Sequence, residues 1–202
     1  FLAVLAALGL SACDPQRVEE TSVEEFRFEA RSERPRIEVR IEDGSVEIEG
    51  VQGSRAIEAE FVKRARSVDR ETARGLLARI EVSARESGEG ARIRFEGRVE
   101  SIPPFGGDLR TDLSLRLPRE VDLEIVTRDG RIQIEGIEGR VRAESGDGRI
   151  LVERASGELR LRTEDGSIVG RELYGRIEAA TGRTQTPEQV AAFIGDRRPD
   201  AY

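Results

Sequence analysis

The sequence predicts an all-β protein, and more narrowly a β-solenoid built from 18-residue coils. Two observations lead to this prediction. The turn pair Asp129-Gly130 recurs 18 residues later as Asp147-Gly148 and again as Asp165-Gly166, without a gap. Between these turns, apolar residues alternate with charged ones, which is the period of a strand with one buried face.

Other positions of the unit keep the same spacing. A second glycine recurs midway between the turns, and one apolar position and one small hydroxyl position recur with it. They are Gly139, Gly157 and Gly175; Ile132, Ile150 and Ile168; and Thr127, Ser145, Thr163 and Thr181. Glycine readily adopts the positive φ that tight turns need, so each unit is interpreted as strand, turn, strand, turn.

Two architectures fit such a unit. In a meander, neighbouring strands run antiparallel and each Asp-Gly pair is a hairpin turn. In a solenoid, each unit winds once and stacks in parallel on its counterpart, so that like residues lie on like residues. The repetition of residue type favours winding. The alternating charge of Arg140, Glu158 and Arg176 also favours it, because stacked neighbours of opposite sign attract.

An earlier copy of the unit, residues 37–53, contains the turn Asp43-Gly44. Between this copy and the repeats, the pattern predicts strands over 56–62, 79–84, 91–99 and 112–117, a short helix over 68–77, and a loop over 101–108. We therefore expect a repeat domain over residues 35–181, preceded by a tether and first strand over 13–34.

The C-terminal tail, residues 182–202, departs from the repeat. Thr186 and Pro187 have the character of an N-cap and first turn for a short helix over 188–194. We expect this helix to cap the last coil; the alternative is a frameshifted or truncated end.

The first ten residues, FLAVLAALGL, form an uncharged apolar run of signal-peptide length that is too short to span a bilayer. They lead into Leu10-Ser11-Ala12-Cys13, which resembles a bacterial lipobox. The resemblance implies that residues 1–12 are a partial signal peptide and that Cys13 is lipidated. We expect an extracytoplasmic lipoprotein, in the periplasm or on the cell surface, held to the membrane by its lipid. Since the chain has no Met, we treat it as an N-terminal fragment.

The composition narrows the possible functions. The chain has no histidine, one cysteine and a net charge of -7, with 36% charged residues of mixed sign. The absence of a basic block argues against a nucleic-acid partner. Histidine is the commonest general base and metal ligand, so we expect no catalytic residue, no cofactor and no metal site. Only residues 145–148 approach the Gly- and Asp-dense repeat of calcium-binding β-rolls.

Three features resemble the bacterial putative-adhesin family with β-strand repeats. They are the Asp43-Gly44 coil, the LRLPR segment at 115–119, and the repeated unit of small hydroxyl, Asp-Gly, Ile, any residue and aliphatic residue. The resemblance covers most of residues 35–181. It implies a solenoid-like fold in an extracytoplasmic, often lipoprotein, setting, and it supplies no catalytic residues.

We therefore expect an adhesin-like, non-catalytic module that binds a protein or glycan partner or has a structural role. A carbohydrate-active β-helix enzyme is the first alternative, but it would gather carboxylates on one face. Here both signs are dispersed, and a pair such as Glu144 and Arg162 is interpreted as a solvated cross-strand contact. The second alternative is an envelope scaffold that assembles through uncapped ends.

Overall fold

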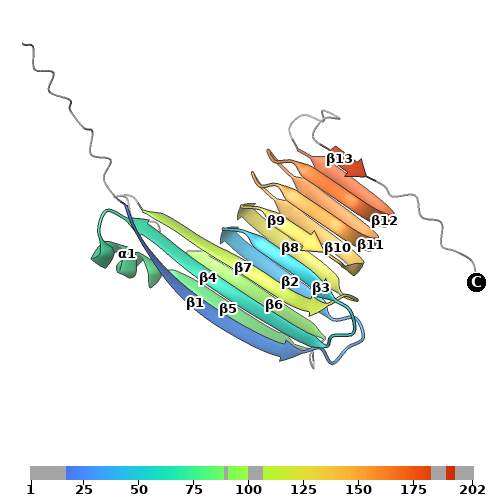
Figure 1. The fold of residues 1–202 in the computed structure, drawn as a ribbon, viewed down its shortest axis with the longest axis horizontal. Coiled ribbons are helices and arrows are strands. Elements are labelled where there is room, and N and C mark those ends of the chain that lie inside the picture. The colour runs from blue at the N-terminus through green and yellow to red at the C-terminus, as the bar shows by residue number, and fades with distance from the viewer. Residues whose placement is uncertain (1–16, 89–90, 100–106, 183–189, 194–202) are drawn as a thin grey trace, which may run out of the picture.

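The computed structural model describes residues 17–88, 91–99, 107–182 and 190–193, which contain thirteen strands and one helix (Figure 1). The elements are β1 (Val18–Glu29), β2 (Arg36–Asp43), β3 (Val46–Val51), β4 (Ala56–Ser67), α1 (Arg70–Leu77), β5 (Ile80–Ser87), β6 (Arg92–Val99), β7 (Asp108–Pro118), β8 (Asp122–Asp129), β9 (Ile132–Glu135), β10 (Glu138–Ser145), β11 (Ile150–Thr163), β12 (Ile168–Thr181) and β13 (Val190–Phe193). The prediction of an all-β protein with one short helix in the N-terminal half is confirmed.

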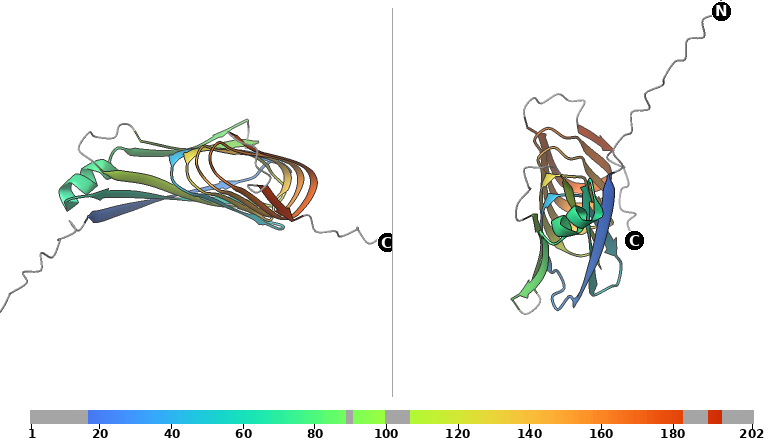
Figure 2. Two further views of the ribbon diagram at one scale, coloured as in Figure 1. Left: turned by 90° about the horizontal axis from the view of Figure 1, so that it is seen from above. Right: turned by 90° about the vertical axis from the view of Figure 1, so that its left-hand side faces the viewer.

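The strands form one mixed sheet that folds back on itself, so that two walls face each other (Figures 1 and 2). The first wall runs β5-β6-β2-β8-β10, and the second runs β1-β4-β7-β3-β9. Strand β11 belongs to both walls, because its first part pairs with β9 and its second part with β10. The sheet is therefore nearly closed, with β1 and β5 at the two ends of its path.

The prediction of a β-solenoid is wrong. A solenoid consists of successive equivalent coils, whereas β1, β4, β5, β6 and β7 lie outside the 18-residue repeat. They introduce antiparallel pairing, of β1 with β4, β4 with β7, and β5 with β6. Eleven strands of both kinds follow one continuous path. The repeat covers only part of this mixed sheet, which is why the sequence pattern gave an incomplete picture of the fold.

Within the repeats, the spacing of 18 residues sets the strand register. Ile150 lies beside Ile132 and Ile168 in parallel pairs. The earlier copy joins the same register, with Asp43 beside Asp129. Strands β8 and β9 flank the Asp129-Gly130 turn, yet they pair with other strands and not with each other. The hairpin of a meander is therefore absent at this turn.

The turn glycines are required mainly by close approach of the backbone. Among the Asp-Gly pairs, only Gly44 has a positive φ. A Cβ built on Gly148 would lie 1.6 Å from the carbonyl oxygen of Gly130, and one on Gly166 would lie 1.9 Å from that of Gly148. Each of these turns is stacked directly on the one before it, so no side chain fits between them.

The C-terminal region differs from its prediction. Residues 190–193 form β13, which pairs in parallel with β12, so the helix predicted over 188–194 is wrong for these residues. The remainder of that predicted helix lies outside the described residues. Parallel addition to β12 continues the pattern of the preceding strands and gives the backbone hydrogen bonds that a capping helix would leave unmade.

The helix predicted over 68–77 is found as α1. Asp69 is its N-cap, and the Asp69 side chain accepts a hydrogen bond from the backbone N–H of Thr72. Ala73 and Leu76 are buried, and Leu76 packs with Ala65 and Leu109 at one end of the sheet. Over the described parts of the chain, we find no helix with the length and apolar character needed to cross a bilayer.

The core fills the space between the walls. Phe61 of β4 and Phe95 of β6 are fully buried, and their rings are 6.4 Å apart across the interior. Phe26 of β1 meets Phe61 edge-on at 5.8 Å. The apolar residue at every second position of each wall thus points inward, and the intervening charged side chains point outward.

Candidate binding surface

The outer surface of the first wall aligns its charged side chains in rows. Parallel pairing places the outward residue of each strand beside that of the next, and β11 and β12 continue the rows through their second halves. We call these three rows the arginine face. The first row is Arg92, Arg36, Asp122, Arg140, Glu158 and Arg176; the second is Arg85, Arg94, Glu38, Glu124, Arg142, Arg160 and Glu178; the third is Glu96, Arg40, Val126, Glu144, Arg162 and Ala180.

The arginine face is positive on a negative chain. Its rows contain ten arginines and seven carboxylates, a net charge of +3, although the whole chain has a net charge of -7. The second wall has the opposite sign. The outward positions of β1, β4, β7 and β3 hold nine carboxylates and five arginines: Glu19, Glu25, Glu29, Glu47, Glu49, Glu58, Glu60, Asp108 and Asp112, with Arg27, Arg64, Arg66, Arg110 and Arg116. The two walls therefore present surfaces of opposite charge.

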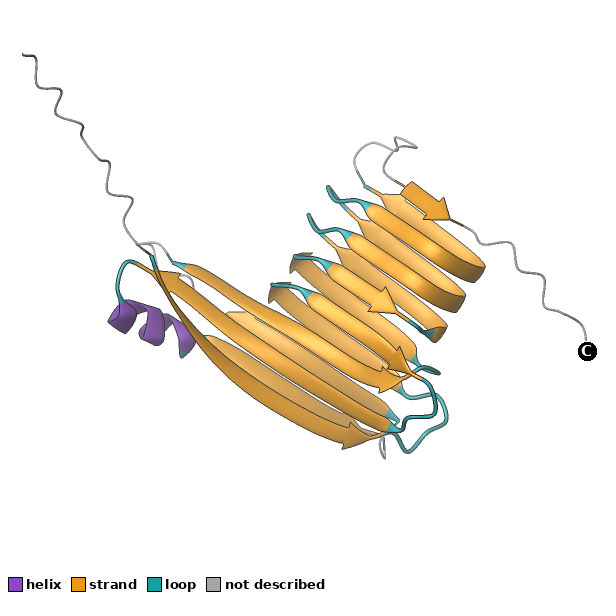
Figure 3. Cartoon of the chain, in the orientation of Figure 1, coloured by secondary structure: helices purple, strands orange, loops and turns teal. Residues whose placement is uncertain are grey.

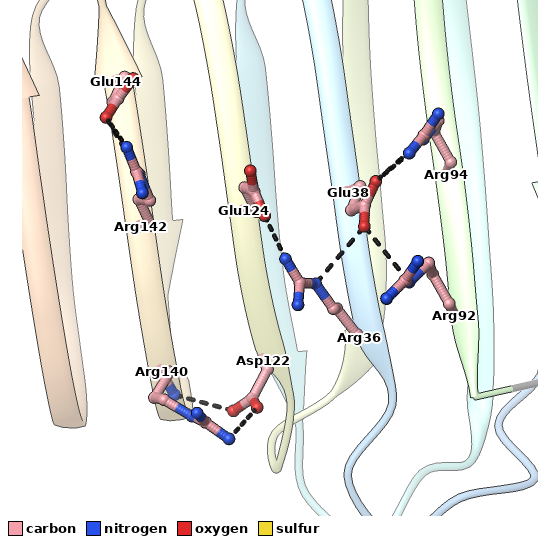
Figure 4. Close-up of polar contacts among 9 residues, drawn as sticks. All are labelled: Arg36, Glu38, Arg92, Arg94, Asp122, Glu124, Arg140, Arg142 and Glu144. Carbon is pink, nitrogen blue, oxygen red and sulfur yellow. Dashed lines mark hydrogen bonds and ion pairs between the residues drawn. The ribbon is translucent and has the colours of Figure 1, made fainter.

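Glu38 lies at the centre of the densest cluster on this face (Figure 4). Its carboxylate accepts hydrogen bonds of 2.9 and 2.6 Å from Arg94 and lies 3.4 Å from Arg36 and 3.3 Å from Arg92. Burial alone would raise the pKa of Glu38, but the hydrogen bond from Arg94 and the charges of the three arginines lower it below its ordinary value. Only 6% of Glu38 is exposed.

The three arginines around Glu38 remain accessible, because 40–51% of each side chain is exposed. Each guanidinium has five N–H donors, and one carboxylate cannot occupy those of three arginines. Arg36 also contacts Glu124, and Arg94 lies near Glu96. The cluster therefore keeps donors directed toward solvent.

A shallow depression of about 230 Å³ lies along the next strands. It is lined by side chains of the first and second rows: Arg36, Asp122, Glu124, Arg140, Arg142, Glu158 and Arg160, with Leu123 and Val141. Arg140 contacts Asp122 at 3.1 Å and Arg142 contacts Glu144 at 2.7 Å (Figure 4). These pairs hold the guanidinium groups in place along the rim of the depression.

The charge ladder predicted from the repeats is aligned as expected, but its ion pairs are different. Arg140 lies beside Glu158, and Glu158 beside Arg176. Arg176 instead contacts Glu178, which is two residues along its own strand. In the same way, Glu144 lies beside Arg162 but contacts Arg142.

The predicted turn residues lie along one edge of the walls, away from the rows. Asp43 and Asp129 end β2 and β8, while Asp147-Gly148 and Asp165-Gly166 connect β10 to β11 and β11 to β12. Partial burial and the charges of Asp147 and Asp43 raise the pKa of Asp129. Arg128 contacts both Asp43 and Asp129. Among the described residues, no group of three His, Cys, Asp or Glu side chains could hold a metal ion.

The second set of predicted turn glycines lies inside strands. Gly139, Gly157 and Gly175 occupy corresponding places in β10, β11 and β12, and all three have positive φ. Cys13, the predicted lipidation site, lies outside the described residues.

The repeated hydroxyls have a structural role that the sequence pattern marked without explaining. Thr163 accepts a hydrogen bond from the backbone N–H of Gly166 and donates to the carbonyl oxygen of Gly148. Ser145 makes the equivalent bonds to Gly148 and Gly130. Each hydroxyl therefore ties its own turn to the turn 18 residues earlier. The recurrence of Ser or Thr three residues before the turn glycine was the signal for this role.

Comparison with known proteins gives little guidance on identity. No family model matches the chain, and no curated protein matches it. One solved structure, described as a putative cell adhesion protein from Clostridium sporogenes, is similar at a TM-score of 0.47 and 11% identity, over 81% of this chain and 97% of that one. Membership of the putative-adhesin family therefore stays a prediction.

Proposed function

We propose that this chain is a non-catalytic, adhesin-like binding module that is held at the cell envelope by lipid on Cys13. The main support is the arginine face, a broad surface whose net charge of +3 opposes that of the chain. Ordered guanidinium groups on a rigid sheet suit recognition, because little side-chain freedom is lost when a partner binds.

The arrangement of carboxylates favours binding over catalysis. A glycosidase needs a carboxylic acid with a raised pKa close to a second carboxylate in the substrate cleft. On the arginine face, the buried carboxylate of Glu38 has a lowered pKa, which suits a permanent ion-pair partner and not a proton donor. Asp129 has a raised pKa, but its side chain is 52% exposed at a turn.

The test uses the full chain, expressed behind a start codon and a short basic leader, with Cys13→Ser as its matched control. Incorporation of a labelled fatty acid into the parent chain but not into Cys13→Ser would support the anchor. Labelling of both, or of neither, would refute it.

The purified parent chain is then screened against envelope glycans and proteins while chemical turnover of each is monitored. Saturable binding without turnover supports a binding module. Turnover of any glycan would establish the enzyme alternative, and concentration-dependent filaments with no ligand would establish the scaffold.

A further inference from the structure

We propose that the arginine face binds a linear acidic polysaccharide, which lies across the strands along the first and second rows. This inference rests on the proposed binding function and names its surface and its class of ligand. The relevant features are the charge of the rows, their spacing and the scarcity of apolar groups.

The spacing of the first row suits a polymer. Its arginines Arg36, Arg140 and Arg176 occupy every second strand, with Asp122 and Glu158 between them. Neighbouring strands are about 4.8 Å apart, so these arginines recur about every 9.6 Å along a straight line. A chain with carboxylates at regular intervals can contact several of them at once, and the planar fork of arginine matches a carboxylate in two hydrogen bonds.

The arginines of this region are accessible and anchored. Arg140, Arg142 and Arg160 are 70%, 59% and 54% exposed, and each is already oriented by a carboxylate neighbour. The depression between the rows gives a bound chain a continuous path past these three side chains. An incoming carboxylate would therefore meet guanidinium groups that need little reorganisation.

The composition of the face favours a glycan over a protein. Protein interfaces are centred on buried aromatic or aliphatic anchors. Within the three rows, Val126 is the one large apolar side chain, and it is 38% exposed. A surface of charged side chains with so little apolar area fits a hydrated, carboxylate-bearing polymer better than a folded protein surface.

The test titrates the full chain with sodium polygalacturonate, with neutral dextran as the ligand control. The face variant is Arg140→Gln/Arg142→Gln/Arg160→Gln. The matched control, on the second wall, is Arg27→Gln/Arg66→Gln/Arg116→Gln. These control arginines are likewise ion-paired and 56–79% exposed. Thermal melts confirm that both variants fold, and the single substitutions Arg140→Gln and Arg27→Gln replace the triples if either does not.

We expect polygalacturonate to bind and dextran not to bind, with affinity that falls as salt is added. Loss of three exposed charge contacts should weaken binding about tenfold in the face variant, and the control should stay within about twofold. Equal loss in both variants would mean diffuse charge attraction and would overturn the proposal. Tighter binding to a DNA duplex or to anionic lipid vesicles would overturn the ligand class.

The outcomes also separate this inference from the proposed function. If polygalacturonate does not bind but the envelope screen finds another saturable ligand, the polysaccharide proposal fails and the binding module stands. If neither experiment finds a ligand, both fail.

Discussion

The substitution Glu38→Gln tests whether one carboxylate holds the densest part of the arginine face together. Glutamine keeps the shape and one acceptor oxygen of the side chain but removes its charge. The three surrounding arginines, Arg36, Arg92 and Arg94, would then repel one another across a nearly buried amide. We therefore expect a loss of folding stability with no change in the fold.

The size of this loss follows from the contacts. A hydrogen bond to a charged group contributes about 1.5–3 kcal/mol, whereas an exposed ion pair contributes about 0.2–1 kcal/mol. Because the arginine side chains are 40–51% exposed, the lower range applies to each of the three contacts. Their sum is about 1–2 kcal/mol. The matched control Glu124→Gln removes the carboxylate that pairs with Arg36 alone, and should cost less than about 1 kcal/mol.

The pH dependence gives a second readout of the same substitution. The pKa of Glu38 is lowered in the folded protein, so its contribution is fully present above the ordinary carboxyl pKa of about 4.3. The contribution is lost as the pH falls through the lower, folded pKa. The stability difference between the parent chain and Glu38→Gln should therefore shrink between pH 7 and pH 3.

Urea unfolding followed by circular dichroism measures both effects. The midpoint should fall in Glu38→Gln while the slope of free energy against urea stays constant, since the fold and its exposed area are unchanged. A midpoint equal to that of the parent chain at pH 7 would refute the argument that three arginines depend on one carboxylate. A difference that stays constant down to pH 3 would show that lost packing, and not lost charge, is the cause.

Three further substitutions test the packing of the fold by the same unfolding measurement. Gly148→Ala places its Cβ 1.6 Å from a backbone oxygen that cannot move independently, so it should cost more than about 2 kcal/mol and disturb the stacked turns; a neutral effect would contradict the close approach. Gly75→Ala in α1 meets nothing within 4 Å and should stabilise by about 0.5–1 kcal/mol, and a loss would be inconsistent with an exposed helix position. Phe61→Ala opens the centre of the core and should cost about 3–5 kcal/mol, whereas Tyr174→Ala, 37% exposed, should cost less than about 1 kcal/mol; similar costs for the two would refute the proposed core.

The local parts of the fold were predictable from the sequence because they depend on near neighbours. The alternation of apolar and charged residues identified strands, and the repeat of 18 identified the parallel register of Ile132, Ile150 and Ile168. The helix near residue 70 was predictable in the same way. Each of these signals is contained in a short window or in an exact repeat.

The overall closure of the sheet was not predictable, because it depends on pairings between dissimilar segments. β4 pairs antiparallel with β7, and β7 pairs in parallel with β3, yet the three strands share no repeated motif. A left-handed backbone conformation at Arg154 and at Glu172 accompanies the passage of β11 and β12 from one wall to the other. Neither residue type favours that conformation, so nothing in the pattern marked these bends.

The charge of the arginine face could not be read from the sequence for the same reason. Along any one strand, such as Arg36-Ile37-Glu38, positive and negative residues alternate with apolar ones and appear dispersed. The excess of arginine arises only when β2 is placed between β6 and β8, which brings Arg92 and Arg94 to either side of Glu38. Burial of Glu38 is a consequence of this pairing, because it is the neighbouring arginines that cover it. A surface with a definite sign can therefore be assembled from strands that are individually close to neutral, and its recognition properties belong to the register and not to any motif.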